Sequence, residues 1–182
     1  MSPDKTTHHT AFFGNTRIAS GSPAEVALAI RDWPGALVFE DATGRQIDLD
    51  LRGSEEEIRV RYAAPARGPG RPKLGVTARE VTLLPRHWDW LAAQPGGASV
   101  ALRKLVETAS RDPKAGRVAA RDAAYRFASA MGGDEAGFEE AMRALYAGKR
   151  KKFHRQLECW PPDVREHLEK MAAPVFDDAV ED

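Results

Sequence analysis

Residues 79–111 constrain the fold most strongly, because they predict a strand and two helices that cannot close a core by themselves. Val81 to Leu84 form a β-branched and apolar run that is typical of a strand. Pro85 ends that run and suits the first turn of a helix, where its missing N–H costs nothing. A unit of this size falls under the limit of about 40 residues below which domains usually need help to fold. The segment therefore needs a partner that pairs with the strand and packs against the helices.

Apolar spacing defines the two helices. Trp88, Leu91 and Ala92 recur at i, i+3 and i+4 in the first helix, and Gln94-Pro95-Gly96-Gly97 then interrupts the pattern. Ser99 is predicted to cap the second helix. The second helix has apolar residues at helical spacing: Leu102, Leu105, Val106 and Ala109. We expect the indole of Trp88 to be buried between the helices, near Leu91, Leu102 and Leu105.

The order of these elements resembles the ribbon–helix–helix family of DNA-binding domains, with a Leu-Pro step into the first helix and a Gly-x-Ser step into the second. Members of that family are intertwined dimers whose paired strands form a ribbon that enters the major groove. The resemblance implies a homodimer in which the strand at 81–84 pairs antiparallel with its symmetry mate. It also implies that Gly97 and Ser99, at the start of the second helix, clamp a DNA phosphate, and that Arg79 lies on the ribbon.

The strand offers poor base-reading chemistry on either face. One face carries Glu80 and Thr82, and the other carries Arg79 and Val81. Glu80 would repel phosphate, and Val81 has no hydrogen-bond donor for a base edge. Two functions therefore remain open. The protein is either a dimeric DNA-binding transcriptional regulator, or a protein-interaction or scaffold module that uses the motif only to dimerise.

Residues 65–75, PARGPGRPKLG, have the composition of a linker. Within them Gly70-Arg71-Pro72-Lys73, with Arg67 upstream, resembles the core of an AT-hook, an extended segment that lies in the minor groove of A·T-rich DNA. The resemblance implies that Arg67, Arg71 and Lys73 follow the DNA backbone or the minor groove beside the ribbon. The same composition is also expected of a linker that does not bind DNA.

The net charge is zero, yet the charges are unevenly distributed along the chain. Residues 65–112 carry eight basic and four acidic side chains, while residues 1–64 carry seven basic and ten acidic ones and residues 113–182 carry twelve and thirteen. The positive excess in the centre favours an anionic partner there. An excess of this size is also compatible with an ordinary solvated surface.

Residues 10–64 predict a small antiparallel sheet with two helices on one face. Strands are expected at residues 11–13, 16–19, 36–40 and 45–51. Gly14-Asn15 is a two-residue turn suited to the first hairpin. Ser22 and Ser54 are each followed three residues later by glutamate, so each predicts a capping box at the start of a helix.

Residues 113–174 predict an all-helical region, separate from the sheet. Four apolar stripes recur at helical spacing, and their most apolar members are Phe127, Met131, Phe138, Met142, Leu145, Phe153, Leu157, Trp160, Val164, Leu168 and Met171. The four consecutive basic residues 149–152 are interpreted as a solvated helix surface. Residues 175–182 are acidic and are expected to be a disordered tail.

No pattern in the chain indicates catalysis, and we expect neither an enzyme nor a cofactor or metal. Asp41 suits a turn, and Asp48 and Asp50 suit the solvent face of a strand. His8 lies in a ten-residue leader that is expected to be flexible. The single Cys159 excludes an internal disulfide and a multi-cysteine metal site.

The sequence contains no apolar run as long as a membrane span, and its first ten residues lack the apolar core of a secretory signal. These observations predict a cytoplasmic protein that does not associate with membranes. The fold class expected is α+β, with a small antiparallel sheet and two helices, a ribbon–helix–helix-like motif at 76–111 and a helical C-terminal region.

Residues 10–176 as a whole resemble an uncharacterised bacterial family, a domain of unknown function. Three stretches carry the resemblance: residues 41–53 (DATGRQIDLDLRG), residues 79–97 (REVTLLPRHWDWLAAQPGG) and residues 122–127 (DAAYRF). The family brings no activity with it, so no catalytic role can be transferred to any residue.

Overall fold

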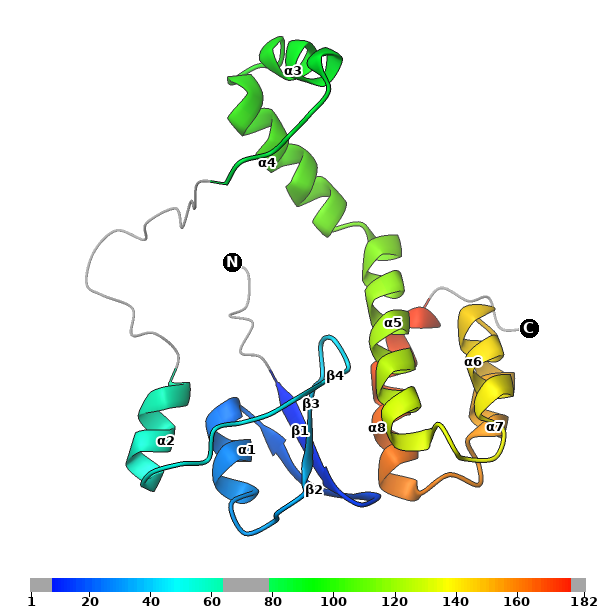
Figure 1. Ribbon diagram of the computed structural model, residues 1–182. Helices are drawn as coiled ribbons and strands as arrows, with labels where there is room; N and C mark the ends of the chain where they lie inside the picture. The colour runs from blue at the N-terminus through cyan, green and yellow to red at the C-terminus, as the bar shows by residue number, and fades with distance from the viewer. Residues whose placement is uncertain (1–7, 64–78, 178–182) are drawn as a thin grey trace. The chain divides into compact units, whose positions relative to one another are not determined.

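A computed structural model of the chain describes residues 8–63 and 79–177. These residues divide into two compact units. Unit 1 contains the residues up to 64 and from 117 onward, and unit 2 contains residues 65–116. The fold is α+β, as the sequence predicts (Figure 1). Within the described residues, no helix has the length and apolar character needed to cross a membrane.

Unit 1 is built on a four-stranded antiparallel sheet with the order β2-β1-β3-β4. The strands are β1 (His9–Phe13), β2 (Thr16–Gly21), β3 (Leu37–Glu40) and β4 (Arg45–Ile47). The predicted hairpin is confirmed, because β1 pairs with β2 across a turn in which Gly14 has a φ of 55°. β4 is shorter than predicted and ends at Ile47, the last of its residues that pairs with β3.

Two helices with confirmed capping boxes lie on one side of the sheet. Helix α1 (Pro23–Ala29) and helix α2 (Glu55–Tyr62) each have a serine N-cap whose side chain accepts from a backbone N–H, while a glutamate side chain accepts from the cap N–H. α1 packs its apolar face on the sheet through Val26 and Ile30, and α2 packs against α1. The backbone N–H of Asp50 donates to Tyr62 Oη at 2.6 Å, which fixes the loop before α2.

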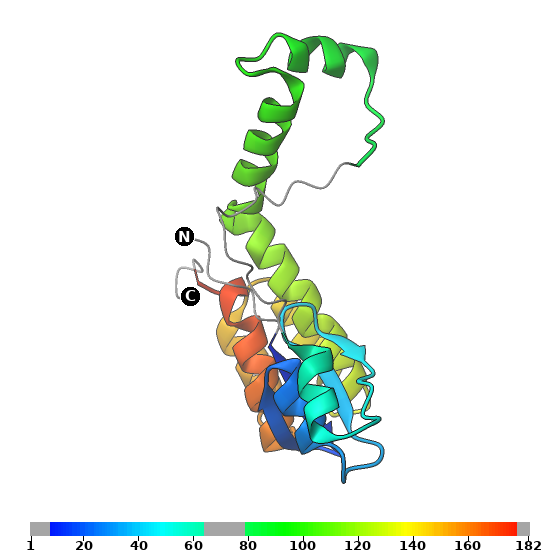
Figure 2. The same ribbon diagram turned by 90° about the vertical axis from the view of Figure 1, so that its left-hand side faces the viewer.

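The other side of the sheet faces the C-terminal helical region, and the first and last α-helices of this region lie next to the sheet (Figures 1 and 2). The helices of this region are α5 (Pro113–Gly132), α6 (Phe138–Tyr146), α7 (Arg150–Gln156) and α8 (Pro162–Ala172), followed by the short 3₁₀ helix η1 (Ala173–Val175). Phe12 and Phe39 of the sheet contact the ring of Phe127 on α5, with centroid distances of 5.5 and 5.0 Å. The sheet and the helical region, which the sequence suggested were separate, therefore share one core.

The turn between β3 and β4 is locked onto α5. Gly44 has a φ of 65° and is buried, and a Cβ at this position would overlap the backbone carbonyl of Ala123. Arg126 Nη1 donates to the carbonyl oxygen of Thr43 at 2.9 Å. This contact joins residues 41–53 to residues 122–127, two of the stretches that carry the family resemblance.

Candidate nucleic-acid interface

Unit 2 contains the two helices that the sequence predicts, α3 (Pro85–Ala92) and α4 (Gly97–Ser110). α3 begins at Pro85, after Leu84 with extended backbone at ψ 149°. The chain enters α4 through two glycines with left-handed backbone, Gly96 at φ 87° and Gly97 at φ 74°. Only glycine adopts this conformation without strain, so the sequence itself determines the sharp turn between the helices.

The strand expected at residues 81–84 is absent from the single chain, where residues 79–84 have no regular secondary structure. A strand exists only when its backbone pairs with another strand, and the described sheet consists of β1 to β4 alone. The structure contains one chain and hence no symmetry mate. The pairing of this segment with a second copy therefore stays a prediction.

The predicted burial of Trp88 is wrong for the single chain. Its side chain is 41% exposed, whereas Leu91, one turn later, is 2% exposed. Leu105, expected beside the indole, is also exposed. Two short helices share one narrow line of contact, and here this line buries Leu91 and Ala101. A stripe of apolar residues in the sequence does not show which of these residues is buried in the contact between the two helices.

Several large apolar side chains of unit 2 are consequently left exposed. Leu91 and Ala101 are its buried apolar residues among those described, and the most exposed of the six large apolar side chains, Val106, is 65% exposed. The six exposed side chains are Val81, Leu84, Trp88, Trp90, Leu105 and Val106. Soluble proteins rarely leave so much apolar surface uncovered in so short a segment, and such surfaces mark interaction sites. We call these six residues the open apolar surface.

The structure describes three of the six residues predicted to bind nucleic acid. Arg79 and Ser99 are exposed, and Gly97 is half-buried at the start of α4. The other three, Arg67, Arg71 and Lys73, lie outside the described residues.

Ser99 does not cap α4 as predicted, because the helix begins two residues earlier, at Gly97. No side chain caps this helix start, so the N–H groups of the first turn have no side-chain acceptor. Within the turn, the carbonyl oxygen of Ser99 accepts a hydrogen bond from Arg103 Nε at 3.1 Å. Uncapped N–H groups at the positive end of a helix dipole favour an anion, which is the geometry required of a phosphate clamp.

The exposed charges around the helix pair are more positive than negative. Residues 79–111 carry five basic side chains, Arg79, Arg86, Arg103, Lys104 and Arg111, against three acidic ones, Glu80, Asp89 and Glu107, and all eight are exposed. Arg111 is paired with Glu107 at 2.6 Å, so one positive charge is neutralised locally. The excess is small, and it gives only modest electrostatic attraction for a polyanion.

Unit 1 contains a buried polar contact that the sequence interpretation missed. His167 on α8 is 1% exposed and lies between the rings of Phe12 and Phe127, at 5.6 and 4.7 Å. Its Nε2 is 3.6 Å from Asp41 Oδ1, and neither atom has a hydrogen-bond partner among the described residues. The other carboxylate oxygen, Oδ2, shares a hydrogen bond of 2.8 Å with His8 Nδ1. Burial lowers the pKa of His167 to about 4.

Helical spacing could have revealed the burial of His167. The residue lies three positions after Val164 and four before Met171, so it belongs to the apolar face of α8. The contact with Asp41 could not have been found in the same way. The two residues are far apart in sequence and meet only because α8 packs on the sheet.

His167 should make the folded chain sensitive to acid. Its pKa is near 6.5 when unfolded and about 4 when folded, so below pH 6.5 the unfolded chain binds a proton that the folded chain does not. We expect the free energy of unfolding to fall by up to about 3 kcal/mol between these pH values. Urea denaturation across this range measures it, with His167→Leu as the test variant and exposed His87→Gln as its control. Equal pH dependence in the wild type and His167→Leu would contradict the assignment.

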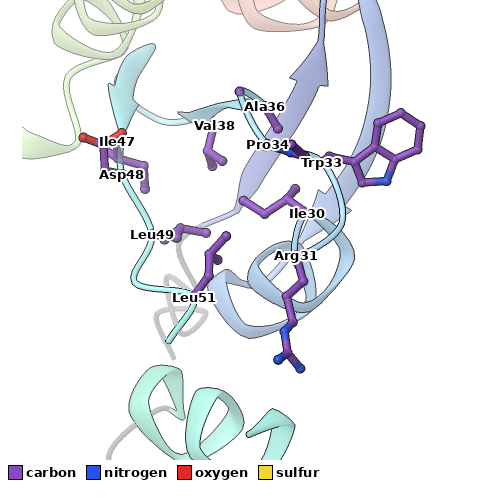
Figure 3. Close-up of a pocket in the computed structure, with 11 residues that line it drawn as sticks. Ile30, Arg31, Trp33, Pro34, Ala36, Val38, Ile47, Asp48, Leu49 and Leu51 are labelled. Carbon is purple, nitrogen blue, oxygen red and sulfur yellow. The ribbon is translucent and has the colours of Figure 1, made fainter. Parts of the chain in front are cut away.

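A pocket of about 270 Å³ also opens on unit 1, between α1 and the strands β3 and β4. In Figure 3, Ile30, Val38, Leu49 and Leu51 point toward its centre, whereas Arg31 points away from it. Small-molecule sites combine an apolar wall with several convergent polar groups, and the charged residues that line this pocket are Arg31 and Asp48 alone. Within residues 8–63 and 79–177, no three His, Cys, Asp or Glu side chains form a metal-binding group.

Comparison with protein families gives one match, and it covers most of the chain. The model of DUF2239, described as an uncharacterized protein conserved in bacteria, matches residues 8–172. The chain belongs to this family. The DUF2239 match includes both units, so the family is defined by the sheet, the helix pair and the C-terminal helices together. Neither a curated protein nor a solved structure matches the chain. The family name carries no activity, and DNA binding and dimerisation remain predictions.

Proposed function

We propose that this DUF2239 protein is a homodimer that is held together by residues 79–111 and binds double-stranded DNA in the manner of ribbon–helix–helix proteins. The observation that carries the proposal is the open apolar surface. Unit 2 leaves six large apolar side chains exposed while burying Leu91 and Ala101. A second copy of the same segment would cover this surface symmetrically, and covering apolar area is the main driving force of stable association.

Two backbone N–H groups within residues 79–84 support the same assembly. No hydrogen bond from the N–H groups of Thr82 or Leu83 is found within the described residues. Antiparallel pairing with a second copy would give one of these two groups a partner and place Val81 or Leu84 against the helices, depending on the register. Dimerisation would then pair the strand and bury the open apolar surface at the same time.

DNA is the partner that best fits the remaining features of the segment. The start of α4 has no side-chain cap, Ser99 is exposed in its first turn, and Arg79 is exposed at the position expected on the ribbon. A dimer would present two such helix starts and two copies of Arg79, related by a two-fold axis. This arrangement matches the pseudo-two-fold symmetry of a DNA operator. Helix starts of this kind bind phosphate through backbone N–H groups.

A protein-interaction module that only dimerises is the second candidate, and the composition of the strand favours it. Glu80 brings a negative charge, and Val81 presents a half-exposed apolar side chain. Neither group reads a base edge in the major groove. Dimerisation is common to both candidates, so the DNA experiment decides between them.

Replacing Ser99 with aspartate tests the phosphate clamp through two effects of opposite sign. A carboxylate in the first turn of α4 interacts favourably with the helix dipole, so the free energy of unfolding should stay equal or rise by up to about 1 kcal/mol. The same charge would repel a DNA phosphate and weaken binding about tenfold or more. Fluorescence anisotropy with mixed genomic DNA fragments, at two salt concentrations, measures the affinity.

Ala115→Asp is the matched control, because it adds the same charge to the exposed first turn of α5, outside the clamp. Arg79→Ala should make the dependence of log affinity on log salt shallower by about 0.9 for each phosphate that the arginine no longer neutralises, and thus by about 1.8 in a dimer. If the wild type binds no DNA at low salt, the DNA-binding function is refuted. If Ser99→Asp binds DNA as well as Ala115→Asp does, the phosphate clamp at the start of α4 is refuted.

A further inference from the structure

We infer that unit 1 carries a binding surface for single-stranded nucleic acid, where α6 meets α7 beside α5. We call it the aromatic–basic patch, and it consists of Arg121, Tyr125, Tyr146, Lys149 and Arg150. The surface belongs to unit 1 alone, so this inference does not rest on the function proposed for unit 2. Exposed aromatic rings next to uncompensated positive charge are the two features that a single strand needs in order to bind.

Two tyrosine rings from different helices form the aromatic part. Tyr125 of α5 and Tyr146 of α6 pack edge to face, with ring centroids 6.0 Å apart and an interplanar angle of 82°. They remain 41% and 50% exposed, although neighbouring aromatic rings on a helical bundle are usually turned into the core. The hydroxyl groups make no hydrogen bond within the described residues. The rings thus keep exposed surface in a fixed arrangement, against which a base can pack.

Arg121 connects the rings to the charges. Its guanidinium carbon lies 4.5 Å from the centroid of the Tyr146 ring, in a cation–π contact. Its Nε is buried and has no hydrogen-bond partner within the described residues, and its Nη2 makes a long contact of 3.5 Å with Asp122 Oδ1. A guanidinium has five N–H donors, so most of this capacity is unused. Phosphate oxygens and base carbonyls are the acceptors that a planar guanidinium binds best.

Lys149 and Arg150 supply the uncompensated charge. They follow Tyr146 by three and four residues, across a turn in which Gly148 has a φ of 67°. The N–H of Lys149 donates to the carbonyl oxygen of Ala144 at 2.9 Å, which holds the basic residues against the end of α6. Within the described residues neither side chain has an acidic partner, whereas Lys152 lies 3.3 Å from Glu140. The two charges next to the rings are therefore available to an anion.

A single-stranded nucleic acid can contact both the tyrosine rings and the basic side chains of the aromatic–basic patch. Other polyanions can contact only the basic side chains. In a duplex the bases stack on each other, and their faces are closed to a tyrosine on a helix surface. A single strand exposes base faces and phosphates together, so the rings and the cations can act at the same time. An acidic peptide would satisfy the cations and leave the rings without a role. A loss of binding affinity when a tyrosine ring is removed therefore distinguishes a single strand from other polyanions.

The experiment measures binding of a labelled thymidine oligonucleotide of about twelve residues to the full chain by fluorescence anisotropy. Tyr146→Ala removes the ring and should weaken binding about tenfold, whereas Tyr146→Phe keeps the ring and should bind like the wild type. Lys149→Ala with Arg150→Ala should make the salt dependence shallower by about 1.4, since each phosphate contact on a single strand contributes about 0.7. Arg45→Ala with Arg59→Ala removes equal charge from β4 and α2 and should leave binding unchanged.

Three results would overturn the inference. The first is no binding of the oligonucleotide at low salt. The second is equal binding by the wild type and Tyr146→Ala. The third is displacement of the oligonucleotide by a glutamate-rich peptide with the same effectiveness as by unlabelled oligonucleotide, because this would show that charge alone recognises the partner. In the second case, a loss of oligonucleotide binding in Arg79→Ala would place the binding on unit 2 instead.

Discussion

Phe127→Ala is expected to lower the free energy of unfolding by about 3–5 kcal/mol. Phe127 is fully buried and contacts the rings of Phe12 and Phe39 on the sheet and of His167 on α8, with centroid distances of 5.5, 5.0 and 4.7 Å. Its removal leaves a cavity where the sheet meets two C-terminal helices. The close-packed rings around this cavity cannot collapse into it without giving up their own packing.

Urea denaturation measures this destabilisation, followed by far-UV circular dichroism and by tryptophan fluorescence. Val118→Ala, on the same helix but exposed, is the control and should change the free energy of unfolding by no more than about 0.5 kcal/mol. A decrease below about 1 kcal/mol for Phe127→Ala would mean that the sheet and the helices do not share this core.

Proline in the expected ribbon should dissociate the dimer. In an antiparallel pair, alternate residues have their N–H groups in the ladder, so either Thr82→Pro or Leu83→Pro must remove an inter-strand hydrogen bond. Each orphaned partner costs about 1–3 kcal/mol, and two-fold symmetry doubles the cost to about 2–6 kcal/mol per dimer. The dissociation constant should therefore rise at least about thirtyfold for one of the two variants.

Thr82→Ala keeps the backbone N–H and is the matched control. Neither N–H makes a hydrogen bond within the described residues, so the proline variants should keep the helix content of the wild type. Sedimentation velocity over a dilution series measures the dissociation constants. Dimers of unchanged stability in both proline variants would show that the contact between copies lies elsewhere.

Local chemistry made much of the fold predictable. The Gly14-Asn15 turn and the capping boxes at Ser22 and Ser54 act within a few residues, so the sequence shows the complete interaction. The glycine pair before α4 also specifies its turn, because Gly96 and Gly97 both have left-handed backbone.

Long-range packing could not be predicted in the same way. The apolar stripe of α5 predicts a buried face. It does not show that Phe127 packs against Phe12 and Phe39 of the sheet rather than against residues of another helix. The contact of His167 with Asp41 depends on that same packing. A sequence pattern gives the period of a buried face, and its partner is determined by the tertiary structure.

The candidate site was the least predictable part, because the position of each residue depends on how its neighbours pack. Ser99 suited a cap, yet the two glycines before it let the helix begin earlier. Trp88 suited a core position, yet the helix pair alone is too small to enclose an indole. Both side chains are exposed in the single chain. In the proposed dimer, Trp88 would lie in the interface between the two copies, and Ser99 would lie at the proposed phosphate site.

Sedimentation equilibrium of the full chain at micromolar concentration tests the central proposal most directly. One chain has a mass of 20.0 kDa, and we propose that a second copy covers the open apolar surface of unit 2. We expect a species of about 40 kDa for the wild type, and a species of one-chain mass for at least one of Thr82→Pro and Leu83→Pro. A wild-type mass of 20.0 kDa at every concentration would contradict the proposal.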